Sequence, residues 1–216
     1  MIQLAIFDLD GTLVNTIGDL AYALNHALET CGLPTLTQTE VEAIVGYSTI
    51  YMFQHAVAEE HKDDWQAVGE AYNAYYPKHC CDHARPYDGI LHVLNRLKAA
   101  GIKLAVVSNK PHRDTLTVVE TLFPKDLFSM VLGRMEKFAT KPDPEPLHFV
   151  LDYFGCKPED AVYIGDSEVD VRFAKNANMP CISVLWGYRT QAVLVEAGAT
   201  KMVDEVDDIC KLLLDT

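Results

Sequence analysis

The beginning of the sequence places two acidic residues directly after an apolar run. Leu4-Ala5-Ile6-Phe7 is followed at once by Asp8-Leu9-Asp10-Gly11-Thr12. The apolar run predicts a buried strand of a parallel sheet, and such sheets bind ligands at the carboxyl ends of their strands. Two carboxylates there repel each other unless a cation neutralises them, and Mg²⁺ suits both carboxylate and phosphate oxygens. Gly11 can leave its N–H free for an anion. These residues therefore predict a site for Mg²⁺ and phosphate at the end of the first strand.

From about residue 88 onward, the chain alternates between strand-like and helix-like segments. Short apolar runs predict strands over 103–107, 130–132, 161–164 and 181–185. Amphipathic patterns predict helices over about 88–100, 113–122, 144–154, 169–177 and 206–214, the first of them capped by Asp88. Strands that alternate with helices form a parallel sheet with right-handed crossovers. The predicted fold class is therefore α/β, with a Rossmann-like, doubly wound parallel sheet.

The segment between residues 16 and 83 has a different pattern and no convincing strand. Helical spacing of apolar residues predicts helices over 17–31, 50–60 and 65–76. Thr37-Gln38-Thr39-Glu40 has the pattern of a capping box that opens a further short helix. We expect residues 16–83 to form a helical domain inserted into a core made of 1–15 and 84–216. Because the insert leaves the core just after the first strand, we expect it over the carboxyl ends of the strands, as a lid.

Charge and cysteine content restrict the partners and the compartment. The formal net charge of −13 argues against nucleic acid as a partner, because nucleic-acid binding needs a basic surface. The six cysteines have neither zinc-site nor C-x-x-C spacing, which is typical of free thiols in a reducing cytosol. Neither a signal peptide nor an apolar stretch of bilayer-spanning length is apparent. We expect a cytoplasmic protein without membrane or nucleic-acid partners, either a monomer or a homodimer.

Four polar clusters follow predicted strands, and their order is informative. They are Asp8-Leu9-Asp10-Gly11-Thr12, Ser108-Asn109, Lys141 in Thr140-Lys141-Pro142-Asp143, and Gly165-Asp166-Ser167-Glu168-Val169-Asp170. In this order they resemble the motifs of the haloacid dehalogenase superfamily, and the helical insert is similar to that superfamily's C1-type cap. The resemblance covers nearly the whole chain. It implies a Mg²⁺-dependent phosphatase that acts on a small phosphorylated substrate through an aspartyl-phosphate.

The acidic residues of these clusters suit particular chemical roles. Asp8, the first residue after the strand, is the candidate nucleophile, because a carboxylate that accepts a phosphoryl group divides a difficult hydrolysis into two steps. Asp10 is the candidate general acid/base. The predicted metal ligands are Asp8, Asp10 and Asp166, with Asp170 in support one helical turn later. The resemblance implies that Asp10 binds the metal through its backbone carbonyl.

A transferring phosphoryl group also needs hydrogen-bond donors and a fixed positive charge. We predict phosphate-binding roles for Gly11, Thr12, Ser108, Asn109 and Lys141, with Ser108 and Lys141 also counted as catalytic. Lys141 would supply positive charge that this acidic chain otherwise lacks. In relatives with this cap, a glycine-containing loop between two cap helices faces the site. This similarity nominates Gly46-Tyr47-Ser48-Thr49 for substrate specificity.

Other polar residues receive secondary roles. We expect Trp186-Gly187-Tyr188-Arg189 to shape the rim of the site, and we expect additional charge from Lys110, His112 and Arg134. The insert also contains histidines that lack a paired histidine or a matching carboxylate in the sequence, namely His55, His61, His79 and His83. We interpret these as surface or packing residues rather than metal ligands.

Several functions remain as alternatives. The phosphoglycolate phosphatase branch is the most similar, through 8–14, Asp19-Leu20, Gly32-Leu33-Pro34, 107–111 and 186–189, which makes 2-phosphoglycolate the best single substrate. β-Phosphoglucomutase-like, sugar-phosphate phosphatase and pyrophosphatase members share most of these features, and Asn15 stands where relatives often have aspartate. Dehalogenases lack the second carboxylate. A phospho-acceptor signalling module would need no large insert, and a catalytically silent binding protein would need no intact site.

Overall fold

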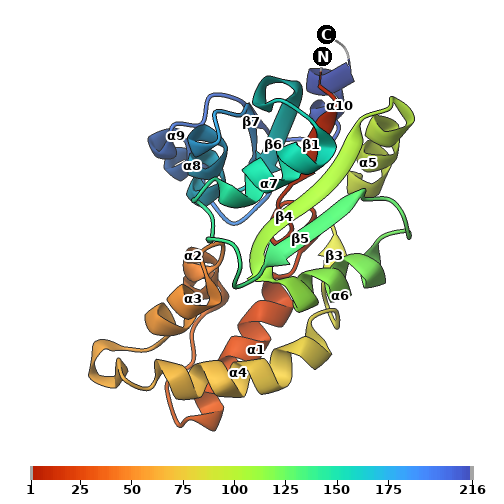
Figure 1. The fold of residues 1–216 in the computed structure, drawn as a ribbon. Coiled ribbons are helices and arrows are strands. Elements are labelled where there is room, and N and C mark those ends of the chain that lie inside the picture. The colour runs from red at the N-terminus through yellow and green to blue at the C-terminus, as the bar shows by residue number, and fades with distance from the viewer. Residues whose placement is uncertain (1, 215–216) are drawn as a thin grey trace.

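A computed structural model describes residues 2–214. Its centre is one sheet of six parallel strands in the order β5-β4-β1-β6-β7-β8 (Figure 1). The strands are β1 (Leu4–Phe7), β4 (Lys103–Pro111), β5 (Met130–Arg134), β6 (Ala161–Gly165), β7 (Cys181–Val184) and β8 (Met202–Val203). Strand β1 is central, because β4 and β6 pair with it on either side. The predicted α/β fold with a doubly wound parallel sheet is confirmed.

Helices cover both faces of this sheet, and the side chains of β1 point alternately to the two faces. Ala5 and Phe7 belong to one apolar cluster, and Leu4 and Ile6 belong to a second cluster on the opposite face. The first cluster contains residues of α5 (Ile90–Ala99), α6 (His112–Leu122) and α10 (Asp208–Leu214). The second contains residues of α7 (Glu145–Phe154) and α8 (Glu168–Asn176). Because β1 is covered on both faces, its run of apolar residues is continuous rather than alternating.

Four helices between β2 (Val14–Asn15) and β3 (Arg85–Pro86) lie together at one end of the sheet (Figure 1). They are α1 (Ile17–Thr30), α2 (Gln38–Ile44), α3 (Thr49–Ala56) and α4 (Trp65–His79). Strands β2 and β3 pair with each other in antiparallel fashion where the chain leaves the core and returns to it. Residues 16–83 contain no strand, as predicted. We propose that they form a separate cap, with β2 and β3 as the connection to the core.

Some local predictions are confirmed. Thr37 and Glu40 form the predicted capping box at the start of α2. Helix α7 ends at Phe154, and Gly155 follows with a φ of +61°. All six cysteines lie in the described part of the chain and are free thiols. No helix within residues 2–214 is long and apolar enough to cross a membrane.

Other local predictions are wrong, mostly at the ends of elements. Strand β4 continues past Val107 to Pro111, because Pro111 still pairs with Arg134 of β5 after a register shift. Helix α5 begins at Ile90 after Gly89, which has a φ of +81°, and no described side chain, Asp88 included, caps it. The helix predicted over 50–60 ends at Ala56, and a separate 3₁₀ turn covers Glu59–His61.

Further differences include elements too short for periodicity to reveal. Strands β2, β3 and β8 have two residues each. Helix α9 (Gln191–Ala197) precedes β8 and was not predicted from the sequence, and a second 3₁₀ turn covers Pro158–Asp160. The last helix begins at Asp208 rather than at residue 206.

Candidate active site

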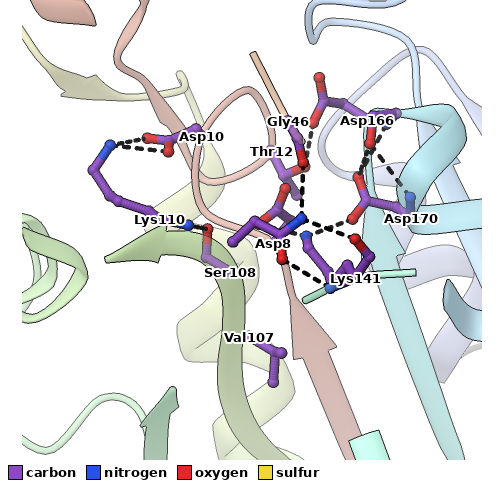
Figure 2. Close-up of polar contacts among 12 residues, drawn as sticks. Asp8, Asp10, Thr12, Gly46, Val107, Ser108, Lys110, Lys141, Asp166 and Asp170 are labelled. Carbon is purple, nitrogen blue, oxygen red and sulfur yellow. Dashed lines mark hydrogen bonds and ion pairs between the residues drawn. The ribbon is translucent and has the colours of Figure 1, made fainter. Parts of the chain in front are cut away.

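Asp8 and Asp10 emerge from the end of β1 and have different partners (Figure 2). Asp8 is buried, and its backbone N–H donates to the carbonyl of Ile164 at 2.9 Å, which fixes it above the middle of the sheet. Asp10 accepts a hydrogen bond from Thr16 Oγ1 at 2.7 Å. Both carboxylate oxygens of Asp10 also accept from Lys110 Nζ, at 2.9 and 3.0 Å. Lys110 therefore holds Asp10 in place. Lys110 was predicted as a source of additional charge, and the structure brings it into the site.

Lys141 forms the positively charged centre beside Asp8. Its Nζ lies 2.7 Å from Asp170 Oδ1 and 3.0 Å from Asp8 Oδ1, and it donates to the Tyr163 hydroxyl at 3.0 Å. The contact with Asp8 is at ion-pair distance but lacks the angles of a hydrogen bond, so Asp8 Oδ1 has no hydrogen-bond partner within residues 2–214. Lys141 is therefore paired with two buried carboxylates. The Asp8 carboxylate still has an oxygen that can accept a hydrogen bond.

The Asn109 side chain fixes the loop that carries Lys141. Asn109 Oδ1 accepts from the Lys141 backbone N–H at 2.9 Å, and Asn109 Nδ2 donates to the Lys141 carbonyl at 3.2 Å. Asn109 Nδ2 also lies 3.2 Å from the carbonyl of Gly46, in the helical insert. The side chain thus connects β4, the Lys141 loop and the insert. A phosphate contact by the Asn109 backbone N–H stays a prediction.

Asp166 follows β6 and is enclosed by backbone. It accepts hydrogen bonds from Thr12 Oγ1 at 3.1 Å and from the backbone N–H of Tyr188 at 2.8 Å. A Cβ on Gly11 would lie 2.5 Å from Asp166 Oδ2, and a Cβ on Gly187 would lie 2.2 Å from Asp166 Cβ. Position 187 therefore requires glycine, and Gly11 also has a φ of +82°, a conformation that favours glycine. The W-G-Y-R segment does lie at the site, where it holds Asp166.

Asp170 uses both of its oxygens within the protein. Asp170 Oδ2 accepts from the Ser167 backbone N–H and from Ser167 Oγ, in a capping box at the start of α8. Asp170 Oδ1 faces Lys141 Nζ and lies 3.1 Å from the Tyr163 hydroxyl. This arrangement makes Asp170 the residue that orients Lys141. Its predicted support of a metal would therefore act through Lys141 and its neighbours.

The acidic residues here carry more negative charge than the protein itself neutralises. Burial, together with Asp170 and Asp10, raises the pKa of Asp8 to about 7 even though Lys141 opposes the shift. Burial and the charges of Asp170 and Asp8 raise the pKa of Asp166 to about 8. Burial alone would lower the pKa of Lys141, but Asp170 and Asp8 outweigh it and raise that pKa.

This excess of negative charge suits a divalent cation. One oxygen from each of Asp8, Asp166 and Asp170 lies within 4.8 Å of the others, and all three residues are buried. Hard cations bind carboxylate oxygens, and Asp8 Oδ1 accepts no hydrogen bond from the described residues, although Lys141 Nζ lies 3.0 Å from it. The donor set therefore fits a metal ion, with Asp8 and Asp166 better available than the fully bonded Asp170.

A small cavity lies between this cluster and the helical insert. Its volume is about 40 Å³, counted as space open to the centre of a water molecule. The core contributes its floor through Asp8, Asp10, Ser108, Asn109, Lys110, Pro111 and Asp114. The insert contributes the rest of the wall through Leu20, residues 44–49, Met52, Tyr72 and Tyr76. The insert therefore does lie over the carboxyl ends of β1 and β4, and the predicted loop Gly46–Thr49 faces the cavity.

Not every predicted residue reaches this cavity. Thr12 is fully buried and donates to Asp166, so its side chain holds an acidic residue rather than lining the cavity. His112 Nδ1 accepts from the backbone N–H of Gly133, and neither His112 nor Arg134 lines the cavity. Three insert histidines do contact carboxylates, contrary to the prediction: His61 with Asp64, His79 with Asp82, and His83 with Asp19. Each contact is with a single carboxylate, as expected of surface or packing residues.

Sequence reasoning missed several residues that line the cavity, among them two tyrosines and an aspartate. Tyr72 and Tyr76 lie one turn apart on α4, with ring centroids 4.9 Å apart. The Tyr76 hydroxyl is buried and has no hydrogen-bond partner within residues 2–214. Asp114, in the first turn of α6, also faces the cavity. The spacing of the tyrosines was visible in the sequence, but it is equally typical of an apolar helix face.

Comparisons with known proteins agree with this architecture. The sequence profile of the haloacid dehalogenase-like hydrolases matches residues 5–184. The chain is 31% identical to the phosphoglycolate phosphatase of Haemophilus influenzae over 96% of both chains. It is 32% identical to phosphoglycolate phosphatase 1 of Pseudomonas aeruginosa, over 96% of this chain and 78% of that one.

Solved structures give the same picture. A crystal structure from Lactobacillus delbrueckii subsp. bulgaricus, assigned provisionally as a phosphoglycolate phosphatase, has a TM-score of 0.93 and 32% identity over 99% of both chains. A predicted phosphoglycolate phosphatase from Haemophilus somnus has a TM-score of 0.91 and 30% identity, over 98% of this chain and 97% of that one. The chain therefore belongs to the haloacid dehalogenase-like hydrolases.

Proposed function

We propose that this protein is a Mg²⁺-dependent phosphatase that removes phosphate from a small phosphorylated metabolite through an aspartyl-phosphate at Asp8, with 2-phosphoglycolate as the first candidate substrate. The observation that carries the proposal is Asp8 itself. Its carboxylate lies on the cavity floor beside Lys141, and one oxygen has no hydrogen-bond partner within the described residues. The named relatives from H. influenzae and P. aeruginosa support the choice of substrate.

The residues around Asp8 suit the two steps of this reaction. An oxygen of Asp8 attacks phosphorus, and the bond between phosphorus and the leaving oxygen breaks. Asp10 gives a proton to the leaving oxygen, and it then takes one from the water that hydrolyses the aspartyl-phosphate. Ser108 Oγ and the backbone N–H of Asn109 would donate to the phosphoryl oxygens, and both residues lie on the cavity floor.

Mg²⁺, held by Asp8, Asp166 and the backbone carbonyl of Asp10, would supply positive charge to the phosphoryl oxygens. Lys141 supplies a second, permanent positive charge next to Asp8. Its charge also lowers the pKa of Asp8 against the larger rise caused by burial, and so favours the ionised carboxylate that a nucleophile requires. Lys141 thereby provides positive charge at the site of a protein whose overall net charge is negative.

The cavity favours a short leaving group. The space open to the centre of a water molecule is only about 40 Å³, and the helical insert closes it on the side facing Asp8 and Asp10. A two-carbon group such as glycolate suits this space better than a hexose does. We therefore rank 2-phosphoglycolate above sugar phosphates, with pyrophosphate as the remaining small alternative. A cytoplasmic location, and a monomeric or homodimeric state, stay predictions.

Mg²⁺-dependent phosphate release from a panel of phosphoesters tests this function. The panel includes 2-phosphoglycolate, ethyl phosphate, glucose 6-phosphate and pyrophosphate. We expect kcat/KM for 2-phosphoglycolate to exceed the others by at least about tenfold, a transition-state difference near ~1.4 kcal/mol. Similar low values throughout would withdraw the substrate but keep the chemistry. No Mg²⁺-dependent release from any compound would favour the signalling or silent alternatives.

Asp114 provides a separate test of how the site responds to the charge of the leaving group. It is 7% exposed and faces the cavity, yet it makes no hydrogen bond or close ion pair with any described residue. Its charge opposes an anionic leaving group, so we expect Asp114→Asn to raise kcat/KM for 2-phosphoglycolate by about threefold to tenfold relative to ethyl phosphate. Equal effects on both substrates would show that Asp114 does not sense the substrate's charge.

The stabilisation that Mg²⁺ gives should depend on pH. The pKa values of Asp8 and Asp166, about 7 and about 8, lie above the ordinary value of 3.8, so these carboxyls favour the folded metal-free protein most at low pH. That contribution is lost as pH rises from about 4 to about 8. Mg²⁺ must displace these protons, so its apparent affinity should be at least about tenfold weaker at pH 6 than at pH 8. Thermal unfolding with and without MgCl₂ should show a larger rise in Tm at pH 8, and an equal rise would contradict the assignment.

Gly187→Ala should weaken Mg²⁺ binding. The added methyl would lie 2.2 Å from Asp166 Cβ, an atom that side-chain rotation cannot move away, so Asp166 must shift with its backbone. We expect the Mg²⁺ affinity measured by calorimetry to fall at least about tenfold. Gly18→Ala is the matched control, because Gly18 lies in α1 and its added Cβ would lie 3.7 Å from His83 Cβ, an ordinary contact. Unchanged affinity in Gly187→Ala would rule out this role for Asp166.

A further inference from the structure

We propose that Arg189 is a positioning residue that holds the cavity-facing loop of the helical insert, Val45–Thr49, against the core. The inference rests on the proposed function, because its kinetic part needs a substrate. Arg189 lies after β7 and is 9% exposed. It does not line the cavity, so any effect on turnover must pass through other residues.

The Arg189 guanidinium reaches the insert through three backbone carbonyls. Nη1 donates to the carbonyl of Glu42 at 2.5 Å. Nη2 donates to the carbonyls of Ala43 and Val45, at 3.3 and 2.7 Å. Nε, on the other edge, donates to Glu168 Oε2 at 2.8 Å. One buried side chain thus joins the end of α2 to the start of α8.

These carbonyls need a donor from outside their own helix. The last carbonyls of a helix have no intrahelical partner, and cationic side chains near them are stabilising. Helix α2 has no basic residue in its last turn, and Val45, the residue after it, is extended rather than a left-handed glycine cap. Arg189 supplies these missing donors. The point at which α2 ends, and at which the cavity-facing loop begins, therefore depends on a residue of the core.

Two further contacts tie the same loop to the core. The Tyr47 hydroxyl donates to Glu168 Oε1 at 2.6 Å, so the Glu168 carboxylate accepts hydrogen bonds from both Arg189 and the loop. The Asn109 side chain donates to the carbonyl of Gly46, a residue with a φ of +102°. Burial and Glu168 raise the pKa of Tyr47 to about 12, so the hydroxyl keeps its proton and stays a donor. Of these contacts, those of Arg189 reach the largest number of backbone carbonyls in the insert.

Loosening this attachment should raise KM more than it lowers kcat. If the loop covers the cavity for only a fraction of the time, the apparent affinity for substrate falls by that fraction. Arg189→Lys keeps a positive charge near Glu168 but cannot reach three carbonyls with one ammonium group. We expect KM for 2-phosphoglycolate to rise at least about tenfold in Arg189→Lys, with kcat within about threefold of wild type.

Hydrogen exchange gives a readout that does not need turnover. The backbone N–H groups of Val45 and Met52 donate to Val41 and Ser48 respectively, and they report the end of α2 and the start of α3. We expect both amides to exchange at least about tenfold faster in Arg189→Lys than in wild type, with and without Mg²⁺ and beryllium fluoride. The rise in Tm caused by Mg²⁺ should stay as in wild type. Arg172→Lys on the exposed side of α8 is the matched control and should change none of these values.

Three results would overturn the proposal. The first is unchanged exchange at Val45 and Met52 in Arg189→Lys. The second is faster exchange with unchanged KM, which would make the attachment irrelevant to turnover. The third is a lowered kcat together with a lost Mg²⁺ effect on Tm, which would place the action of Arg189 at Asp166. If wild type releases no phosphate from any phosphoester, the proposed function fails, while the exchange data still decide whether Arg189 holds the loop.

Discussion

Asp8→Asn is expected to reduce kcat for phosphate release by at least about 10⁴-fold, because an amide cannot accept the phosphoryl group. The same substitution should not unfold the protein. Asp8 is one of several buried carboxylates, and its pKa of about 7 shows that its negative charge is unfavourable without metal. Removing that charge should therefore leave the Tm of the metal-free variant at pH 8 equal to or higher than that of wild type.

Two measurements test whether Asp8 is the nucleophile. Mass spectrometry of wild-type protein quenched in acid during turnover should find one phosphoryl group on the peptide that contains Asp8, and the variant should carry none. Asp152→Asn, at an exposed position of α7, is the control for loss of one carboxylate and should keep full activity. Turnover by Asp8→Asn within about tenfold of wild type would remove Asp8 as the nucleophile.

Lys141→Met is expected to give the largest loss of stability. Lys141 is 4% exposed and lies within 3.0 Å of carboxylate oxygens of both Asp8 and Asp170. Removing one partner of a buried ion pair costs about 3–5 kcal/mol, because the remaining charges stay buried without compensation. We expect the free energy of unfolding at pH 8, measured with urea, to fall by about that amount, and phosphate release to be lost.

The pH dependence of this loss identifies its cause. At pH 5 the Asp8 carboxyl, with its high pKa, binds a proton and no longer needs Lys141, so the difference from wild type should shrink. Lys175→Met, on the exposed side of α8, is the control for loss of a lysine and should stay within about 0.5 kcal/mol of wild type. A loss that is the same at pH 5 and pH 8 would point to packing rather than charge.

The sequence alone predicted which residues meet at the site. Asp8, Ser108 and Asp166 each lie at or just after the end of an apolar run, and the carboxyl ends of parallel strands meet at one edge of the sheet. Lys141 is several residues beyond β5, and the motif order suggested its role. The structure adds what holds it there, namely the two hydrogen bonds between its backbone and the Asn109 side chain.

The helical insert was predictable as a set of helices but not as a wall of the cavity. Apolar periodicity identified α1, α3 and α4, because one stripe of each is buried, and the capping box identified α2. The same periodicity does not distinguish Tyr72 and Tyr76, which line the cavity, from tyrosines that only fill a core. Residues Asp114 and Glu168 likewise have the pattern of ordinary acidic residues in the first turn of a helix.

The sequence by itself determined the α/β fold, the helical insert and the residues gathered at the strand ends, because these follow from hydrophobic period and from residues close together in the chain. Only the tertiary structure decided the partners of the charged side chains. Lys110 pairs with Asp10 across 100 positions, and Arg189 reaches the carbonyls of α2 across more than 140. Such contacts depend on how whole elements pack, and no local pattern records them.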